Sequence, residues 1–447
     1  MSLIGYFANR LPKIFYTHTL KLLPQKIVGF NTQKYMDSPV YMTLSTQKRL
    51  ENTKIKLAAS KSESNRVLII NALAGGNEDN LENLSSARDT RTMLRLLSTH
   101  QTTWDVLDAG TTMRFLTSYA AVQNLTRTLT GTPRMQQRPI GILVEALREL
   151  GAEVNYQKEA GYPPLEVGGL TSQASAALSI RGDVSSQYIS SLLMIAPMLP
   201  EGLRLTLTGH IGSRPYINMT LALMRRFGAQ VDWADDHTLV VAAKPYQQGN
   251  YTVESDWSGA SYWFSMVALA ETAELTLLGL REDSLQGDQA IVDIMEQLGV
   301  RSEYTTEGIR LWKGPSVKHL EVDFTHCPDL AQTVAVACAA KGVSGSFVGL
   351  ESLRIKETDR IAALQQELAK IGARLEEPET GRWTLTPSVE LPQQVSIHTY
   401  EDHRMAMAFA PLATRMEVAI EEPEVVQKSY PEFWDHVHQV GFALPQA

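Results

Sequence analysis

The chain has 447 residues, of which 44% are hydrophobic and 20% charged, a composition typical of a globular protein long enough for two or three domains. Its formal net charge of -8 argues against a general nucleic-acid binder, so an anionic ligand would need a local cluster of basic residues. Two cysteines, Cys327 and Cys338, make neither a disulfide framework nor a zinc set, and no stretch reaches the ~18 apolar residues of a membrane span.

The first 36 residues differ from the rest of the chain, because they contain Lys and Arg but no Asp or Glu before Asp37. Basic, acid-poor segments are typical of transit-type presequences. We nevertheless interpret residues 1–36 as an upstream extension that adds nothing to the fold, because they lack Ser and Arg richness and a clear apolar core. On that interpretation the protein is expected to be cytoplasmic.

The stretch KSESNR at 61–66 stands directly before the apolar run VLIINALA and has two interpretations. Ser is favoured at the start of a helix, where its hydroxyl accepts a hydrogen bond from a free N–H group. A helix N-terminus with Lys61 and Arg66 beside it can also bind a phosphate or a carboxylate. These six residues alone favour the helix start, and the remaining motifs must decide.

Short stretches that combine cations or hydroxyls with Gly or Pro recur along the chain, mostly before apolar runs. Each one alone has an ordinary explanation, such as a surface charge, a helix cap or an ion pair within a helix. Together they indicate a site for anionic ligands. In chain order they are DAGTTMRFL (108–116) with Gly110, TGTPRMQQRP (130–139) with Arg134 and Arg138, VSSQYISS (184–191) with Ser185, Ser186 and Gln187, HIGSRPYI (210–217) with Ser213, HCPDLAQT (326–333) with Asp329, RIKETDRI (354–361) with Lys356, Glu357 and Arg360, EDHRMAMAFA (401–410) with His403 and Arg404, and KSYPEF (428–433) with Lys428.

The motifs of several large enzyme classes are missing from the sequence. It has no GxxxxGK[ST] phosphate loop, no HExxH zinc motif and no GxSxG nucleophile elbow. The sequence therefore offers no motif for a P-loop, for a zinc site or for a serine nucleophile.

A pattern of glycines predicts the architecture. An amphipathic helical run, then Gly, then a strand-like segment occurs at Gly151, Gly228, Gly299 and Gly372. Gly is favoured just past a helix C-terminus because it enters the left-handed region without a Cβ clash. Intervals of roughly 70 residues predict a mixed α and β unit repeated about six times. Because six such units exceed one compact core, two lobes of three units are expected.

The motifs KSESNR, AGTTMRFL, GTPRMQQRPI, SSQY, SRPYI, ESDWSGASYW, RIKETDRI, EDHRMAM and KSYPEF occur in the order found in the 3-phosphoshikimate 1-carboxyvinyltransferase (EPSP synthase) family, which the chain resembles from about residue 54 to residue 436. The resemblance implies an α/β (α+β) fold, a two-lobed inside-out α/β barrel of six βαβαββ units, three per lobe. Residues 37–59 and 254–447 are then expected to form the lobe containing both termini, and residues 60–253 the second lobe. The active site is expected in the cleft between them.

The resemblance also implies an activity. Enzymes of this family transfer the enolpyruvyl group of phosphoenolpyruvate to the 5-hydroxyl of shikimate 3-phosphate and release phosphate. The reaction proceeds by addition and elimination through a tetrahedral intermediate and belongs to chorismate and aromatic amino acid biosynthesis. The family needs no cofactor and no metal. The expected partners are therefore the two substrates, without nucleic acid or membrane, and the expected state is a monomer.

Roles for individual residues follow from the matching motifs. Asp329 is expected to act as the base near the 5-hydroxyl, Glu357 to move the methylene proton, and Lys61 to assist the leaving phosphate or the 5-hydroxyl. The residues expected to bind shikimate 3-phosphate are Lys61, Ser62, Arg66, Ser185, Ser186, Gln187, Ser213, Asp329 and Lys356. Those expected to bind phosphoenolpyruvate are Lys61, Gly110, Arg134, Gln187, Arg360, Arg404 and Lys428.

Three positions depart from residues common in the family. Asp108 and Ser352 stand where Asn is common, and Phe115 stands where Pro is common. A carboxylate at position 108 would repel phosphoenolpyruvate unless it is paired or turned away.

Two alternative functions remain open. The first is UDP-N-acetylglucosamine enolpyruvyl transferase, which shares the fold and the donor but carries a Cys in the loop that corresponds to 130–139, where this chain has none. The second is a non-catalytic phosphosugar-binding protein, which would need the anion-binding residues but neither Asp329 nor Glu357.

Overall fold

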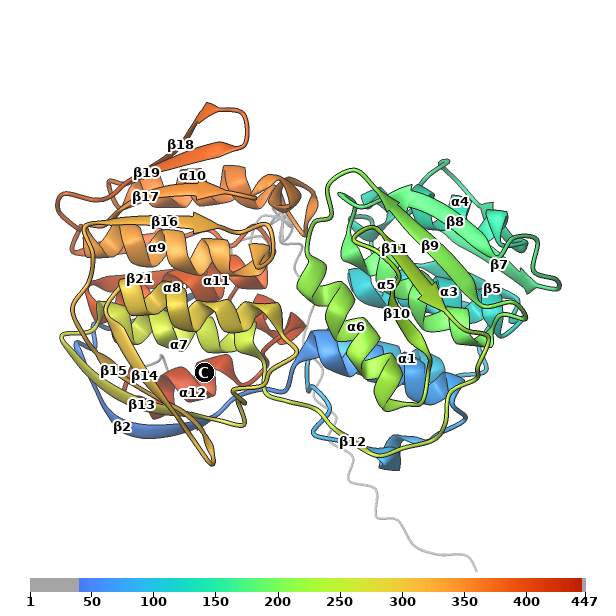
Figure 1. The fold of residues 1–447 in the computed structure, drawn as a ribbon. Helices are drawn as coiled ribbons and strands as arrows, with labels where there is room; N and C mark the ends of the chain where they lie inside the picture. The colour runs from blue at the N-terminus through green and yellow to red at the C-terminus, as the bar shows by residue number, and fades with distance from the viewer. Residues whose placement is uncertain (1–39, 444–447) are drawn as a thin grey trace, which may run out of the picture. The chain divides into compact units, whose positions relative to one another are not determined.

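The computed structural model describes residues 40–443, which form two lobes (Figure 1). Each lobe has its own hydrophobic core. The interpretation of residues 1–36 as an extension therefore lies outside the described residues. One core draws on residues 44–58 and 257–442, and we call the part of the chain around it the terminal lobe. The other core draws on residues 59–253, and we call its surroundings the central lobe.

The central lobe holds six α-helices and ten strands among the described residues. Its helices are α1 (Lys61–Leu73), α2 (Arg88–Leu97), α3 (Gly110–Val122), α4 (Gly141–Glu149), α5 (Ser186–Ile195) and α6 (Arg214–Arg226). Its strands are β3 (Leu81–Glu82), β4 (Thr103–Asp105), β5 (Arg127–Thr130), β6 (Ala152–Tyr156), β7 (Leu165–Leu170), β8 (Ala177–Arg181), β9 (Leu203–Thr208), β10 (Val231–Trp233), β11 (Thr238–Val241) and β12 (Tyr251–Thr252).

The terminal lobe begins with two strands and resumes after the central lobe. Its helices are α7 (Trp257–Leu269), α8 (Ile291–Gln297), α9 (Ala331–Lys341), α10 (Arg360–Lys370), α11 (His403–Phe409) and α12 (Phe433–Gln439). Its strands are β1 (Tyr41–Leu44), β2 (Arg49–Lys56), β13 (Thr272–Leu278), β14 (Val300–Thr305), β15 (Gly308–Lys313), β16 (His319–Asp323), β17 (Ser344–Val348), β18 (Arg374–Glu379), β19 (Arg382–Thr386), β20 (Gln394–Ile397) and β21 (Glu417–Glu421).

Four sheets have the same strand order, which confirms the repeated unit predicted from the glycines. Two strands run parallel, and an antiparallel hairpin continues the sheet beside the second of them. The orders are β4-β5-β7-β6, β8-β9-β11-β10, β2-β13-β15-β14 and β16-β17-β19-β18. In a fifth sheet β20 and β21 are parallel and β1 pairs antiparallel with β21.

The predicted glycines occupy equivalent places in these units. Gly151, Gly228, Gly299 and Gly372 each follow a helix and precede the strand that begins the hairpin. Their φ angles are 105°, 84°, 83° and 81°, in the left-handed region that other residues rarely adopt. The helix therefore ends at the same point of every unit because a residue without Cβ stands there.

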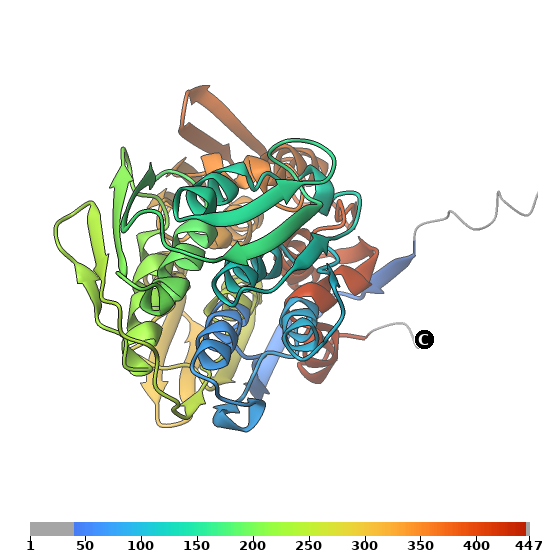
Figure 2. The same cartoon turned by 90° about the vertical axis from the view of Figure 1, so that its right-hand side faces the viewer.

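The helices lie inside and the sheets outside, as the inside-out barrel requires. In α7 every residue except Ser258 is buried, and in α9 every residue except Lys341. Helices that are apolar nearly all round must be enclosed on all sides. Figure 2 shows the helices nearly end-on with strands around them.

The chain passes between the cores twice, and the two passages are hydrogen-bonded to each other. Ala59 forms an isolated bridge with Ser255, and the Ser60 N–H donates to the Glu254 carbonyl oxygen at 2.8 Å. Buried hydrophobic residues change core between Ala58 and Ala59 and between 253 and 257. We propose these passages as the lobe boundaries. No helix within residues 40–443 has the length and apolar character needed to cross a membrane.

Candidate active site

Two cavities lined by side chains from both lobes share Arg138. The first has a volume of about 1130 Å³, and its walls include the loop 132–138, Glu357 and Lys428. The second has a volume of about 430 Å³, and its walls include residues 185–188, Ser213 and Lys356. Segments more than 200 residues apart in sequence thus meet at these cavities. Of the residues expected to bind the substrates, the walls include Arg134, Ser185, Ser186, Gln187, Ser213, Lys356 and Lys428, but not Lys61, Ser62, Arg66, Gly110, Asp329, Arg360 or Arg404.

Lys428 joins the two lobes by an ion-pair network. It ends the 3-10 helix η9 (Pro423–Lys428) of the terminal lobe and is buried. Its Nζ lies 2.8 Å from Asp108 Oδ2, 2.8 Å from the Asp108 carbonyl oxygen and 3.4 Å from Asp89 Oδ1. Lys61 Nζ lies 3.2 Å from Asp89 Oδ2, so Asp89 pairs with both lysines. Asp108 thus has the cationic partner that its charge requires.

Asp329 is surrounded by three cations. Arg404 Nη2 lies 2.9 Å from its Oδ2, Arg360 Nη1 3.2 Å from its Oδ1, and Lys356 Nζ 3.8 Å from its Oδ1. Burial alone would raise the pKa of this carboxyl, but the charges of Arg404, Lys356 and Arg360 outweigh burial and hold the pKa well below its usual range. Asp329 is therefore a carboxylate at neutral pH, the form that can accept a proton.

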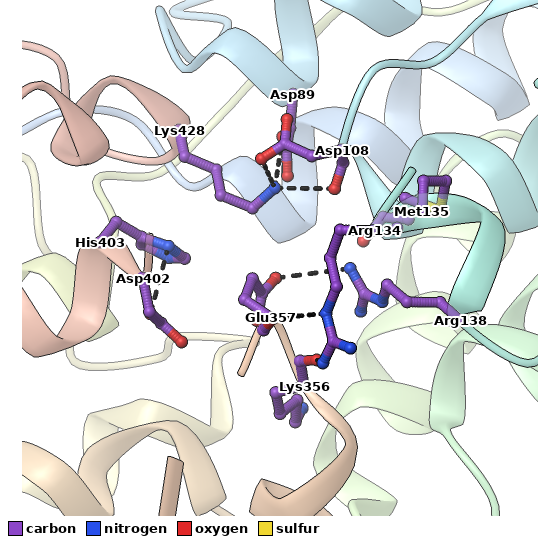
Figure 3. Close-up of polar contacts among 12 residues, drawn as sticks. Asp89, Asp108, Arg134, Met135, Arg138, Lys356, Glu357, Asp402, His403 and Lys428 are labelled. Carbon is purple, nitrogen blue, oxygen red and sulfur yellow. Dashed lines mark hydrogen bonds and ion pairs between the residues drawn. The ribbon is translucent and has the colours of Figure 1, made fainter. Parts of the chain in front are cut away.

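Glu357 lies between cations of both lobes, as Figure 3 shows from the side of the first cavity. Its Oε2 accepts a hydrogen bond from Arg360 Nη2 at 2.8 Å, and its Oε1 lies 3.7 Å from Arg138 Nη1. Burial opposes ionisation, but Arg360, Arg138 and Lys428 together hold the pKa of this carboxyl well below its usual range. Glu357 is accordingly ionised while the substrates are absent.

Gly110 leaves room for the Arg138 guanidinium. A Cβ at Gly110 would lie 2.7 Å from Arg138 Nη1 and 2.8 Å from Nη2. Gly110 also begins helix α3, whose first N–H groups have no partner within the helix. The absent side chain therefore brings a buried guanidinium against the start of a helix, which makes the place doubly favourable for an anion.

The two loop arginines differ in position. Arg134 is exposed, and its Nε donates to the Glu357 carbonyl oxygen at 3.0 Å. Arg138 is buried and lines both cavities. Arg134 was the residue expected in the site, with Arg138 only as its neighbour, because the loop sequence alone does not indicate which guanidinium points inward.

Hydroxyl and amide groups line the second cavity. The Ser185 hydroxyl caps helix α5 by accepting a hydrogen bond from the Gln187 N–H at 3.4 Å. Ser186 and Gln187 lie in the wall of the second cavity. Gln187 Nε2 donates to Thr111 Oγ1 at 3.0 Å. Ser213 has a φ of 53°, and its N–H donates to the Thr325 carbonyl oxygen of the other lobe at 3.1 Å.

Arg66 lies within the central lobe and is not among the residues that line the cavities. Its Nε donates to Thr220 Oγ1 at 2.7 Å, and its Nη1 donates to the Ser62 carbonyl oxygen at 2.8 Å. Burial lowers the pKa of Arg66 to about 10, so it remains a cation. Ser62 is half-buried beside it. The assignment of Arg66 and Ser62 to shikimate 3-phosphate stays a prediction.

Sequence reasoning missed Asp89, Arg88 and Asp402. Asp402 caps helix α11 and accepts Arg360 Nε at 2.7 Å, so it fixes that guanidinium. Its place directly before His403 and Arg404 was a signal of this role. Asp89 and Arg88 stand in SSARDTRTM, where the alternation of signs resembles an ordinary solvated helix and indicates no partner across the lobes.

Neither metal ligands nor a reactive thiol were found in the part of the chain that the structure describes. No group of His, Cys, Asp and Glu residues within 40–443 has an arrangement that fits a metal ion. Burial, followed by the nearby carboxylates of Asp288 and Asp323, raises the pKa of Cys327 to about 12. Burial likewise lowers the pKa of His403 well below its usual range, with Lys61 and Arg404 adding to the effect, so this imidazole is neutral.

Comparison with known proteins identifies the family that the chain resembles. The sequence model of EPSP synthase (3-phosphoshikimate 1-carboxyvinyltransferase) matches residues 98–437. A 3-phosphoshikimate 1-carboxyvinyltransferase of Bacteroides fragilis is 49% identical over 405 residues, which cover 90% of this chain and 98% of the relative. A protein of the same name from Sulfurovum is 36% identical over 419 residues, covering 87% and 96%.

The fold has solved counterparts. A structure of EPSP synthase from Acinetobacter baumannii aligns with 91% of this chain and 100% of its own, with a TM-score of 0.74 and 19% identity. A likeness at that identity supports the two-lobed α/β architecture, whereas the sequence relatives support the family.

Proposed function

The chain belongs to the EPSP synthase family, and from this premise we propose how its cavities perform the family's reaction. The enzyme transfers the enolpyruvyl group of phosphoenolpyruvate to shikimate 3-phosphate in aromatic amino acid biosynthesis. Both substrates carry a phosphate and a carboxylate, so the site must bind four anionic groups. The observation that supports the proposal most is the set of buried and half-buried cations that both lobes direct to the two adjoining cavities.

Phosphoenolpyruvate binds in the first cavity, near the point where Arg138 meets Lys428 and Glu357. Guanidinium groups suit carboxylates and phosphates because they donate two parallel hydrogen bonds. Arg360 and Arg404 supply two more guanidinium groups behind Asp329. We therefore add Arg138 to the residues expected from the sequence, whereas Arg134 lies at the cavity mouth and contributes less.

Shikimate 3-phosphate binds in the second cavity. Ser185, Ser186, Gln187 and Ser213 offer hydroxyl and amide groups to its phosphate, and Lys356 offers a charge. Lys356 also lies 3.8 Å from Asp329 Oδ1, which links the second cavity to this carboxylate. An acceptor hydroxyl positioned here would face both Asp329 and the donor in the first cavity, as attack requires.

The reaction forms one C–O bond, breaks another, and adds a proton to C3 of phosphoenolpyruvate that is later removed. The 5-hydroxyl oxygen bonds to C2 of phosphoenolpyruvate while its proton passes to Asp329. The C3 methylene gains a proton and becomes a methyl group. In the second half the methyl group loses a proton, the double bond returns, and the C2–O bond to phosphate breaks. Each positioned acid–base step is typically worth ~10²–10⁴-fold in rate.

Substrate binding itself prepares Glu357 to donate the C3 proton. In the free enzyme Arg360, Arg138 and Lys428 hold its pKa low. These same cations are the partners of the incoming phosphate and carboxylate, so a bound anion cancels much of their field. The Glu357 pKa then rises, because burial favours the neutral acid. Lys61, whose Nζ lies 3.2 Å from Asp89 Oδ2, is the cation that we propose to neutralise the departing phosphate.

The cysteine positions disfavour the alternative acceptor, UDP-N-acetylglucosamine. The loop 130–139 contains no thiol, and Cys327 is buried with a raised pKa. Asp329 and Glu357 disfavour a non-catalytic role. Both carboxylates pair with Arg360, whereas a protein that only binds anions would leave such a cation free for its ligand.

Proton exchange tests the proposed mechanism. With shikimate 3-phosphate and phosphoenolpyruvate in D₂O, the methyl group of the intermediate gains deuterium and loses protium or deuterium in turn. The product's methylene group should therefore contain deuterium by mass spectrometry. Glu357→Gln should slow product formation by about 10²-fold or more. Asp232→Asn, at an exposed surface pair, is the matched control. Product without deuterium would exclude addition and elimination.

A further inference from the structure

Asp108 has two cationic partners, one from each lobe. Arg88 Nη2, from the central lobe, lies 3.0 Å and 2.9 Å from the two carboxylate oxygens. Lys428 Nζ, from the terminal lobe, lies 2.8 Å from Oδ2. Figure 3 shows the Lys428 ammonium group between Asp89 and Asp108, close to the loop that carries Arg138. Arg88, Asp108 and Lys428 thus form two ion pairs that share Asp108, and all three residues line the first cavity.

The environments of the three charges are unequal. The Lys428 side chain is 2% exposed, that of Asp108 is 29% exposed and that of Arg88 is 46% exposed. Burial would raise the Asp108 pKa, but Lys428 and then Arg88 outweigh burial and lower it, so the carboxylate is charged. Its negative charge therefore lies against the one buried lysine that lines the first cavity among residues 40–443.

We propose that Asp108 is an internal counter-ion of Lys428 that competes with phosphoenolpyruvate for this ammonium group, and that Arg88 sets the strength of the competition. The inference rests on the proposed function, in which Lys428 binds the donor. An anionic group that enters the cavity meets a lysine already neutralised by Asp108. Arg88, with two bonds to the same carboxylate, draws Asp108 toward the cavity rim and lowers the cost of the exchange.

Lys428 does not depend on the Asp108 carboxylate for its position. Its Nζ also lies 2.8 Å from the Asp108 main-chain carbonyl oxygen and 3.4 Å from Asp89 Oδ1. Asp108→Asn keeps the backbone acceptor and nearly the same side-chain volume, so the ammonium group remains in the wall. The substitution therefore changes the charge that opposes the donor while it leaves the cation in place.

Steady-state kinetics of the full chain provides the test, with phosphoenolpyruvate and shikimate 3-phosphate varied separately. Asp108→Asn should lower the KM for phosphoenolpyruvate roughly three- to tenfold, the scale of a partly exposed charge pair. The KM for shikimate 3-phosphate should stay within twofold. Arg88→Gln should raise the KM for phosphoenolpyruvate by about threefold, because Asp108 then pairs with Lys428 alone. The double variant should behave as Asp108→Asn does, because Arg88 acts through that carboxylate.

Glu274→Gln is the matched control, since it removes the carboxylate of the exposed pair with Arg310, which lines neither cavity. An unchanged or higher KM for phosphoenolpyruvate in a folded Asp108→Asn protein would overturn the inference. So would an Arg88→Gln effect of equal size with and without Asp108. If the wild-type enzyme does not turn over, the proposed function fails, and calorimetric titration of phosphoenolpyruvate into the same variants still decides the inference.

Discussion

Gly110→Ala places one methyl group where the Arg138 guanidinium now lies. The new Cβ would be 2.7 Å from Arg138 Nη1, whereas ordinary contact begins at 3.4 Å, so the guanidinium must move by about 0.7 Å. The obstructing atoms are the end of a flexible side chain, and Ala has a higher helix propensity than Gly at this first residue of α3. Folding stability should therefore change little, while the anion-binding geometry changes.

The size of the effect follows from the displacement. A misplacement of about 1 Å at a site of positioned charges can cost ~10²-fold in rate. A shift of about 0.7 Å is thus expected to lower kcat/KM for phosphoenolpyruvate by roughly ten- to a hundredfold, or about 1.4–2.7 kcal/mol of transition-state stabilisation. Because we assign Arg138 to the donor subsite, the KM for shikimate 3-phosphate is expected to change much less.

Initial rates of phosphate release at varied phosphoenolpyruvate measure this effect, and thermal unfolding measures the stability. Gly249→Ala is the matched control, since no heavy atom lies within 4 Å of a Cβ at that position. Full kcat/KM in Gly110→Ala, with an unchanged melting temperature, would refute the argument that Arg138 must lie against Gly110 for the donor to bind.

Three further predictions concern the pair Arg134 and Arg138, the buried Glu63, and Asp329. Arg138→Ala should lower kcat/KM for phosphoenolpyruvate by about 10²-fold or more and Arg134→Ala by less than about tenfold, because only the former guanidinium is buried between the cavities; equal losses in steady-state kinetics would contradict this placement. Burial raises the Glu63 pKa to about 7, so the wild type loses folding stability as the pH rises from 5 to 8, because the folded state must then ionise a buried carboxyl. Glu63→Gln has no such group, so its free energy of unfolding should rise relative to that of the wild type by up to about 3 kcal/mol over this range. Chemical denaturation measures the difference, and a difference that does not change with pH would contradict the prediction. Asp329→Asn should unfold more readily than the wild type at pH 7, and the difference should narrow below about pH 4, because the lowered Asp329 pKa stabilises the fold above the unfolded pKa and this contribution is lost as the pH falls; a gap that widens in acid would count against it.

The architecture could be predicted from local signals. Gly151, Gly228, Gly299 and Gly372 end their helices because the left-handed conformation is a property of the residue itself. Ser185 and Asp402 cap helices for an equally local reason. Such signals extend over a few residues of sequence, so they survive in any tertiary context, and the four glycines revealed the repeated unit.

The arrangement of the site could be predicted only in part, because its contacts join distant segments. The buried Arg66 donates hydrogen bonds to the hydroxyl groups of Thr220 and Ser190, more than 120 residues away in sequence. Nothing in KSESNR indicates those partners. The contacts of Arg88 and Asp89 with Asp108 and Lys428 likewise depend on the fold, so the local sequence does not indicate them. The need for a partner at Asp108 was deduced from its charge, but the identity of the partner required the fold.

The most direct test of the account is phosphate release by the purified enzyme with phosphoenolpyruvate and one of two acceptors, shikimate 3-phosphate or UDP-N-acetylglucosamine. We expect stoichiometric phosphate with shikimate 3-phosphate and none above background with the nucleotide sugar. Phosphate release with UDP-N-acetylglucosamine, or silence with both acceptors in a folded protein, would contradict the assignment of the two cavities to these substrates.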